Sequence, residues 1–223
     1  MRIDVRGSIV ATDDKWIYDF YDIESTCPKD VFDNIQKANG EPIDIYISSG
    51  GGDLFAGVEI YSELRNYTGQ VKIHITGNAA SAASIIAMAG ESDISPAASI
   101  MIHCVALYGV SGNHTDMDSY SDLLKTLDKS IAQAYMDKTG KSEAEILEML
   151  NKETWLTSSE AVEQGFIDSI SVNKNIQFTA SNNCLLPLEV INKMRNERKT
   201  PQNQVIDDVD IFMKKIEIER TRY

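Results

Sequence analysis

The sequence predicts an α/β fold built on a parallel sheet. Short apolar strands alternate with segments whose apolar residues recur every three or four positions, the spacing of an amphipathic helix. Turns rich in glycine or small residues join several strands to the next helix. This order is typical of βαβ units, which place a parallel sheet between helices. Ligands gather at the carboxyl ends of such strands, so the turns there are candidate sites.

The composition indicates one acidic domain of generous size with an appendage. The 223 residues are 43% hydrophobic and carry a net charge of −13, which argues against a nucleic-acid partner. No stretch approaches the roughly 18 apolar residues of a membrane span, and no signal peptide opens the chain. Three distant cysteines make neither a disulfide framework nor a metal quartet. We therefore expect a cytoplasmic protein without a membrane partner.

Charge and composition change toward the C-terminus. The excess of acidic residues lies before Glu189, and basic residues slightly outnumber acidic ones from there on. This change predicts a domain over residues 1–175 and a C-terminal extension over residues 176–223. The extension contains the polar linker "RNERKTPQNQ" and then one amphipathic helix, whose apolar residues are Val205, Val209, Phe212 and Ile216.

The first half of the chain is expected to hold four strands and three helices. The strands are "RIDVRGSIV" (broken at Gly7), "PIDIYIS", "QVKIHIT" and "SIMIH". A helix is expected in "TCPKDVFDNIQKANG", where Pro28 suits the first turn and Gly40 lies past the end. A second helix follows the glycine run of residues 50–52, with an apolar face of Leu54, Val58, Tyr61 and Leu64. A third begins within residues 76–90, "TGNAASAASIIAMAG".

The second half opens with a long helix predicted over residues 117–138. Its apolar stripe is Tyr120, Leu124, Leu127, Ile131 and Tyr135, and Gly140 ends it. Because it is long for a small α/β domain, we expect it to project and pack against another subunit. Two capping boxes then start short helices, Ser142 with Glu145 and Thr157 with Glu160. Gly165 stops the second of these helices, and "FIDSISV" is a closing strand.

Only three histidines are available for chemistry. His74 lies within a strand and is expected to be structural, whereas His114 lies in a Gly/Asn loop and is expected to be solvated. His103 ends an apolar strand, where an imidazole can be held rigidly and still face a cleft. Its position alone favours a satisfied core histidine over a catalytic base. No histidine pair has the spacing of a zinc site, so no metal is predicted.

The glycine run after the second strand does not match a phosphate-binding loop. It lacks Gly-Lys-Ser/Thr, and Phe55 occupies the place of the third glycine in a dinucleotide motif. Asp53 at the helix start would repel a phosphate. Two interpretations remain, a tight turn or a set of backbone N–H groups directed at an oxyanion.

The serines of residues 76–90 also have two interpretations. Small residues can serve close packing of a buried helix. Alternatively, a serine at a helix N-terminus is a nucleophile stabilised by unpaired N–H groups, with His103 as its base. There is no G-x-S-x-G motif, so a hydrolase elbow of that type is not supported. The competing class is an acyl-CoA enzyme, which uses paired N–H groups without a serine nucleophile.

Four segments, taken in order, resemble the proteolytic subunit of the Clp protease family. The family's strand with Asn-Ser-Pro-Gly-Gly appears here as "ISSGGGDLFAG", its Gly-x-Ala-Ala-Ser as "GNAASAAS", and its Met-Ile-His as "SIMIH". The closing motif appears as "LTSSEAVEQGFIDSI". The resemblance covers about residues 3–170. It implies a ClpP/crotonase-like spiral of ββα units with a projecting long helix.

The resemblance also implies roles for individual residues and requires no metal or cofactor. Ser81 would be the nucleophile, His103 the general base, and the N–H groups of Gly52 and Ala82 the oxyanion hole. Gly51 would shape the turn, and Ser84 would only pack.

The third member of the triad is assigned from the closing motif. In the family an Asp stands two positions before the aromatic-Leu pair of that motif. Counting back from "WLTSSEAVEQG" places Glu153 there, and a glutamate can orient a histidine. Asp168 is the alternative.

The implied activity is that of an ATP-dependent Clp-type serine endopeptidase acting on polypeptides through an acyl-enzyme. The chain would form homo-oligomeric rings through the long helix, as hexamers or heptamers, single or stacked.

The chain begins at the first core strand, without the axial-loop segment that helps dock an AAA+ unfoldase, so dependence on that partner is an open question. This feature and the C-terminal extension resemble phage and prophage head maturation proteases, which process capsid or scaffold proteins. The alternatives are a crotonase-like acyl-CoA enzyme and a non-catalytic assembly component.

Overall fold

The computed structural model describes residues 1–171. The strands are β1 (Arg2–Ile9), β2 (Ser25–Thr26), β3 (Ile43–Gly52), β4 (Val71–Ala80), β5 (Glu91–Ile94), β6 (Ser99–Ile102), β7 (Thr154–Thr157) and β8 (Ser169–Ile170). The helices are the 3₁₀ turn η1 (Thr12–Asp14), α1 (Lys15–Phe20), α2 (Pro28–Ala38), α3 (Leu54–Asn66), α4 (Ala82–Ala87), α5 (His114–Thr139), α6 (Glu143–Asn151) and α7 (Ser158–Glu163). The predicted boundary at residue 175 and the amphipathic helix of the extension lie outside the described residues.

The strands form one 8-stranded sheet in which the order β2-β1-β3-β4-β5-β8 is parallel throughout. Beyond β5, the strand β6 also pairs with the carboxyl end of β4, and β7 pairs with β6 antiparallel. The predicted α/β class with a parallel sheet is therefore confirmed. Strand β4 pairs first with β5 and then, at its carboxyl end, with β6. The chain segments that follow β4 and β6 therefore start side by side.

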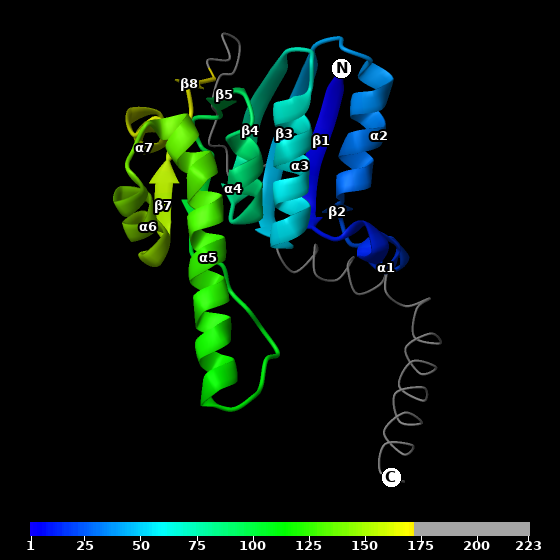
Figure 1. Cartoon of the computed structure of the whole chain (residues 1–223). Coiled ribbons are helices and arrows are strands. Elements are labelled where there is room, and N and C mark those ends of the chain that lie inside the picture. Colours follow the sequence, from blue (N-terminus) through cyan, green and yellow to red (C-terminus); the bar gives the residue numbers. More distant parts are fainter. Residues whose placement is uncertain (172–223) are drawn as a thin grey trace, which may run out of the picture. The chain divides into compact units, whose positions relative to one another are not determined.

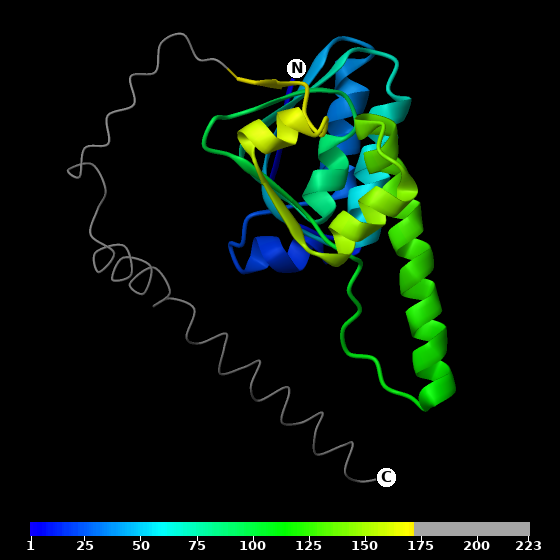
Figure 2. The ribbon, with the colours of Figure 1, turned by 90° about the vertical axis from the view of Figure 1, so that its left-hand side faces the viewer.

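One face of the sheet carries the core. Helices α2, α3 and α4 lie against this face (Figure 1), and the view turned by 90° shows them on one side of the strands (Figure 2). Burial alternates along β1, β3 and β4, and the buried positions are dominated by isoleucine. Each fully buried isoleucine stabilises the fold by about 1.5–3 kcal/mol, and β-branched residues suit strands.

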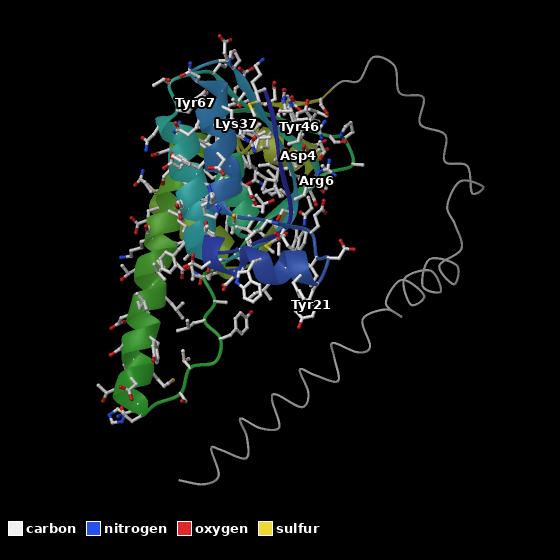
Figure 3. All side chains as sticks on the ribbon, turned by 90° about the vertical axis from the view of Figure 1, so that its right-hand side faces the viewer. Asp4, Arg6, Tyr21, Lys37, Tyr46 and Tyr67 are labelled. Atoms are coloured by element: carbon white, nitrogen blue, oxygen red, sulfur yellow. The ribbon has the colours of Figure 1, made fainter. Side chains whose placement is uncertain are left out.

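The opposite face of the central strands is polar. The expectation that helices cover both faces of the sheet is therefore wrong for these strands. Asp4, Arg6 and Tyr46 lie on this face (Figure 3). His74 is also on it, with Nδ1 2.8 Å from Oδ2 of Asp93 and Nε2 3.2 Å from Oδ1 of Asp44. Both ring nitrogens of His74 are therefore paired with carboxylates, which fits the structural role predicted for this residue.

The sequence suggested that the glycine run is a turn after the second strand, but in the structure this run is part of β3. In the β1–β3 ladder Arg6 pairs with Ser48, but Ser8 pairs with Gly51, so β3 carries one extra residue and forms a bulge. Oγ of Ser49 donates to the carbonyl of Gly7 at 2.6 Å and accepts from the N–H of Gly51 at 3.1 Å. The same bulge explains why β1 continues through Gly7, where the sequence predicted a break.

Helix α5 is longer than predicted and extends well away from the sheet (Figure 1). It begins earlier because Oδ1 of Asn113 accepts from the N–H groups of Thr115 and Asp116, which caps the first turn. Its C-terminal half is buried at Ile131, Ala132, Ala134 and Tyr135. The predicted apolar stripe is therefore core only in this half, and the projecting half leaves Met117 and Leu123 exposed.

Other local predictions have mixed outcomes. Both capping boxes are present. The predicted apolar face of α3 does pack against the core, with Leu64 buried and Leu54, Val58 and Tyr61 partly buried, but the most buried residues of the helix also include Ala56, Gly57 and Ile60. The closing strand shrinks to the two residues of β8, and η1, α1, β2, β5 and β7 were not anticipated. Within residues 1–171, no helix combines the length and apolar character that crossing a membrane would require.

Candidate active site

Ser81 occupies a sharp turn between a strand and a helix. Strand β4 ends at Ala80 and α4 starts at Ala82, so Ser81 alone reverses the chain, with φ 55° and ψ −127°. A non-glycine residue with positive φ costs roughly 1–3 kcal/mol and persists only where its surroundings fix it. One fixing contact is the N–H of Ser81, which donates to the carbonyl of Met101 in β6 at 2.9 Å.

His103 follows directly after β6, and the sheet brings it to Ser81. The β4–β6 ladder pairs Ala80 with Met101, so the two residues leave neighbouring strands at the same edge of the sheet. Nε2 of His103 lies 2.7 Å from Oγ of Ser81. A hydroxyl and an imidazole in this contact form the nucleophile and base pair of covalent hydrolases.

Both side chains border a pocket of about 750 Å³. Gly52 and Ala82, the two residues proposed for the oxyanion hole, border it as well. Most of the other lining side chains are apolar and come from the start of α3, from α4, from the segment after His103 and from α5. The pocket could therefore accept an extended chain with an apolar side chain beside the reacting atoms.

Glycine is required where the bulged end of β3 meets the Ser81 turn. A Cβ on Gly51, whose φ is +92°, would lie 2.6 Å from the carbonyl oxygen of Ala80 and 2.7 Å from Cβ of Ser81. It would also lie 3.0 Å from the nitrogen of Ala82, so Gly51 packs directly beneath this amide. A Cβ on Gly50 would meet nothing within 4 Å.

Glu153 lies at the same end of the β6–β7 pair as His103, but its side chain bonds elsewhere. The ladder ends at the pair Ile102–Thr154, so His103 directly follows it on one strand and Glu153 directly precedes it on the other. Glu153 itself has a positive φ of 50° and is not part of the strand. The exposed Glu153 instead accepts a hydrogen bond from Nε1 of Trp155 at 3.3 Å. Among residues 1–171, no carboxylate bonds to Nδ1 of His103.

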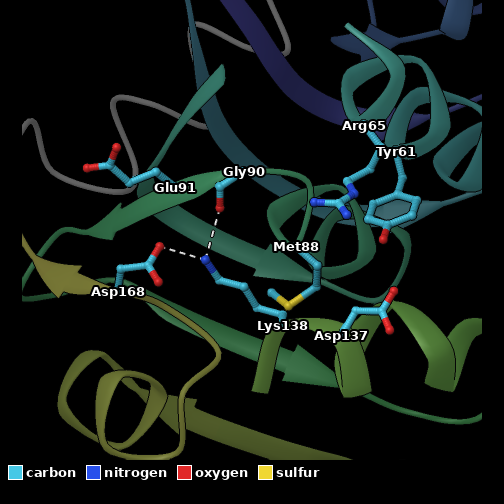
Figure 4. Close-up of a pocket in the computed structure, with 8 residues that line it drawn as sticks. All are labelled: Tyr61, Arg65, Met88, Gly90, Glu91, Asp137, Lys138 and Asp168. Atoms are coloured by element: carbon cyan, nitrogen blue, oxygen red, sulfur yellow. Dashed lines mark hydrogen bonds and ion pairs between the residues drawn. The ribbon is translucent and has the colours of Figure 1, made fainter. Parts of the chain in front are cut away.

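Asp168 lies at a different place in the fold, where β5, β8 and α5 meet. Its Oδ2 accepts from Nζ of Lys138 at 2.6 Å (Figure 4). The same oxygen accepts from the N–H of Ser92 at 2.7 Å and from Oγ of Ser92 at 3.0 Å. Partial burial acts to raise the pKa of Asp168, but the bonds from Lys138 and Ser92 outweigh it and leave that pKa below its ordinary value. The structure gives Asp168 a structural environment and does not bring it to His103.

Two further groups near the site were not assigned chemistry from the sequence. Ser84 is fully buried and hydrogen-bonded to the Ser81 carbonyl and to Tyr135, so it does more than pack. Cys104 follows His103, but burial raises its pKa to about 11, which keeps the thiol protonated and unreactive at neutral pH. In the described part of the chain, no group of three His, Cys, Asp or Glu side chains is placed to hold a metal ion.

Comparison with known proteins gives the family. The family model described as Clp protease matches residues 25–174. The proteolytic subunit 1 of the ATP-dependent Clp protease of Chlamydia abortus is 33% identical over 141 residues, which is 61% of this chain and 73% of that protein. The corresponding subunit 1 of Protochlamydia amoebophila is 35% identical over 136 residues, 59% of this chain and 66% of that protein. A proteolytic subunit of Bacteroides fragilis is 31% identical over 138 residues, 60% of this chain and 66% of that protein.

The matched region contains the Ser81 turn, the His103 strand end and the closing segment around Glu153 and Asp168. The family match and the hydroxyl–imidazole contact agree, and they favour a peptidase over an acyl-CoA enzyme of related architecture. The chain belongs to the Clp protease family and is a serine peptidase related to the proteolytic subunits of that protease.

Proposed function

We propose that the chain is a serine endopeptidase in which Ser81 is the nucleophile and His103 the general base. The observation that carries the proposal is the 2.7 Å contact between Oγ of Ser81 and Nε2 of His103. Nε2 takes the hydroxyl proton as Oγ attacks the scissile carbonyl carbon, and the imidazolium then gives this proton to the leaving amine. A water molecule, deprotonated by the same imidazole, hydrolyses the acyl-enzyme and frees Ser81.

The N–H groups of Gly52 and Ala82 would stabilise the tetrahedral oxyanion. Both residues border the pocket beside Ser81. Ala82 is the first residue of α4, and the first N–H groups of a helix have no partner within it. Gly51 packs under the Ala82 amide, which fixes its position before the charge develops.

Glu153 is the proposed third member of the triad. Its position at the end of the β6–β7 ladder that His103 also adjoins supports this role. A change of side-chain rotamer away from Trp155 would direct the carboxylate at Nδ1 of His103. The carboxylate would then hold the tautomer that carries its proton on Nδ1, leaving Nε2 free to accept the Ser81 proton.

The relatives are named as subunits of an ATP-dependent protease, and we propose that this chain also acts within a homo-oligomeric ring. The projecting half of α5, with Met117 and Leu123 exposed, supports its use as the contact between subunits. Rings of six or seven subunits, single or stacked, are the assemblies to test. An AAA+ unfoldase would be needed for folded substrates and not for short peptides.

A role in phage or prophage head maturation is the finer proposal. It is supported by the resemblance of the motifs, whereas the relatives described above are bacterial Clp subunits. Incubation of the assembled protein with capsid or scaffold protein tests it directly. Discrete cleavage products would support the proposal, and an intact substrate beside rapid cleavage of unfolded casein would reject it.

A fluorophosphonate probe tests the activity. We expect covalent labelling of the full chain, abolished by Ser81→Ala together with peptide hydrolysis. The matched control is Ser62→Ala, which removes an exposed hydroxyl bonded to Val58 on α3 and should keep both. Labelling that survives Ser81→Ala, or hydrolysis that survives it, would contradict the assignment of the nucleophile. A wild-type protein that is neither labelled nor active would favour the non-catalytic alternative.

A further inference from the structure

We propose that Tyr135 and Ser84 are positioning residues that hold the strained turn of the nucleophile through a chain of two hydroxyl groups. The inference rests on the proposed role of Ser81. It concerns a contact between α4 and α5.

The carbonyl of Ser81 receives two hydrogen bonds from a single residue. Ser84 donates its N–H at 2.9 Å and its Oγ hydroxyl at 2.6 Å to this carbonyl. The N–H of Ser81 is fixed separately by Met101. The positive φ of Ser81 is therefore held at both of its peptide groups, and within residues 1–171 the hydroxyl of Ser84 is the only side-chain group that bonds to either of them.

The direction of the second bond follows from proton count. Oγ of Ser84 lies 2.7 Å from the hydroxyl oxygen of Tyr135. A serine hydroxyl has one proton, and that of Ser84 is committed to a carbonyl that can only accept. Tyr135 must therefore donate to Ser84, and the bonds run from Tyr135 through Ser84 to Ser81. Bonds in such a chain polarise and strengthen one another.

Burial shields the hydrogen bonds of this chain of hydroxyl groups from water. Ser84 is 0% exposed and Tyr135 is 1% exposed, so water does not compete for either hydroxyl. Burial also raises the pKa of Tyr135 above its ordinary value, which keeps its hydroxyl protonated as a donor throughout the working pH range.

The same contact links the nucleophile to the long helix. Tyr135 belongs to the buried half of α5 and also borders the pocket that contains Ser81 and His103. The position of α5 therefore sets the position of the Ser81 carbonyl, and with it the direction in which Oγ leaves the turn. Leucine or phenylalanine at residue 135 would fill the same space but would have no hydroxyl to fix the position of the Ser81 carbonyl through Ser84.

The test compares Tyr135→Phe, Ser84→Ala and the double variant in the assembled full chain. We expect Tyr135→Phe to lower both kcat and the rate of fluorophosphonate labelling about tenfold, with KM and native mass nearly unchanged and thermal unfolding lowered only modestly by the lost buried hydrogen bond. Ser84→Ala should lower kcat at least as far. The double variant should match Ser84→Ala within about twofold, since Tyr135 acts only through Ser84. Tyr61→Phe, which removes a half-buried tyrosine hydroxyl elsewhere, should leave kcat unchanged.

Three outcomes would overturn the inference. Wild-type kcat in a folded and assembled Tyr135→Phe protein would reject the role of Tyr135 while leaving the proposed peptidase intact. Losses that multiply in the double variant would show that the two residues act independently. A wild-type protein that is neither labelled nor active would reject the proposed function, and this inference would fail with it.

Discussion

Oγ of Ser81 lies 2.7 Å from Nε2 of His103, although 22 residues separate them in the chain. The contact exists because β4 and β6 are parallel neighbours that end at the same edge of the sheet. Neither residue reaches the other through a local turn. The proposed chemistry therefore depends on the sheet and on the few residues that fix its edge.

Changing Glu153 to Gln should lower kcat by about 10²–10⁴-fold and leave KM nearly unchanged. The expected loss arises because the imidazole of His103 would lack the carboxylate that orients it and stabilises its positive charge. Steady-state kinetics on a fluorogenic peptide measures the effect, with Asp168→Asn as the control that keeps kcat. Near-normal turnover in Glu153→Ala together with collapse in Asp168→Ala would move the role to Asp168.

Replacing Gly51 by Ala should destabilise the fold and abolish most of the turnover, at least 100-fold. The new Cβ would lie 2.6 Å from the carbonyl oxygen of Ala80, and φ of +92° is itself unfavourable for alanine, at about 1–3 kcal/mol. Gly50→Ala is the matched control, because its Cβ meets nothing within 4 Å and should change stability by less than about 0.5 kcal/mol. Equal kinetics and equal thermal unfolding of the two variants would disprove the proposed close approach.

Asp168→Asn should reduce the free energy of unfolding by about 1 kcal/mol at pH 7 without changing kcat. The pKa of Asp168 is lowered in the folded state by Lys138 and Ser92, against the opposing effect of burial. A group with a lowered folded pKa stabilises above its unfolded pKa of about 3.9 and loses this effect as the pH falls through the folded value.

The measurement is chemical denaturation of both proteins at several pH values. The difference between them should shrink below about pH 4 and approach zero where Asp168 is protonated. Asp13→Asn, which changes an exposed carboxylate of η1, should leave stability unchanged at every pH. A constant difference across the whole pH range would contradict the ionic origin of the effect.

Placing a charge on the exposed apolar surface of α5 should weaken assembly. Met117 is 38% exposed on the projecting half of the helix, so Met117→Lys should leave the fold of each subunit intact. Burying a lysine in a subunit contact is costly, and we expect at least a tenfold higher concentration for half-assembly. Native mass measurement over a dilution series checks this, with Ser119→Lys as the control. If both variants assemble like the wild type, this half of α5 is not the contact.

The sequence by itself determined the class of fold and pointed to the two side chains that we propose to react. Period-two apolar patterns fixed β1, β3 and β4, capping residues fixed the starts of α6 and α7, and the ordered motifs singled out Ser81 and His103. These signals are local, since each depends on a few adjacent residues whose propensities agree with the final structure.

Only the tertiary structure decided what surrounds Ser81. The glycine run became a strand bulge because β1 pairs with it out of register, which neighbouring residues do not encode. Tyr135 looked like one more apolar residue of a helical stripe, and only the packing of α5 on α4 gives its hydroxyl a partner. The structure likewise directs the carboxylate of Glu153 to Nε1 of Trp155, which the motif does not reveal. Long-range pairing and side-chain competition arise when distant segments meet, so spacing along the chain does not reveal them.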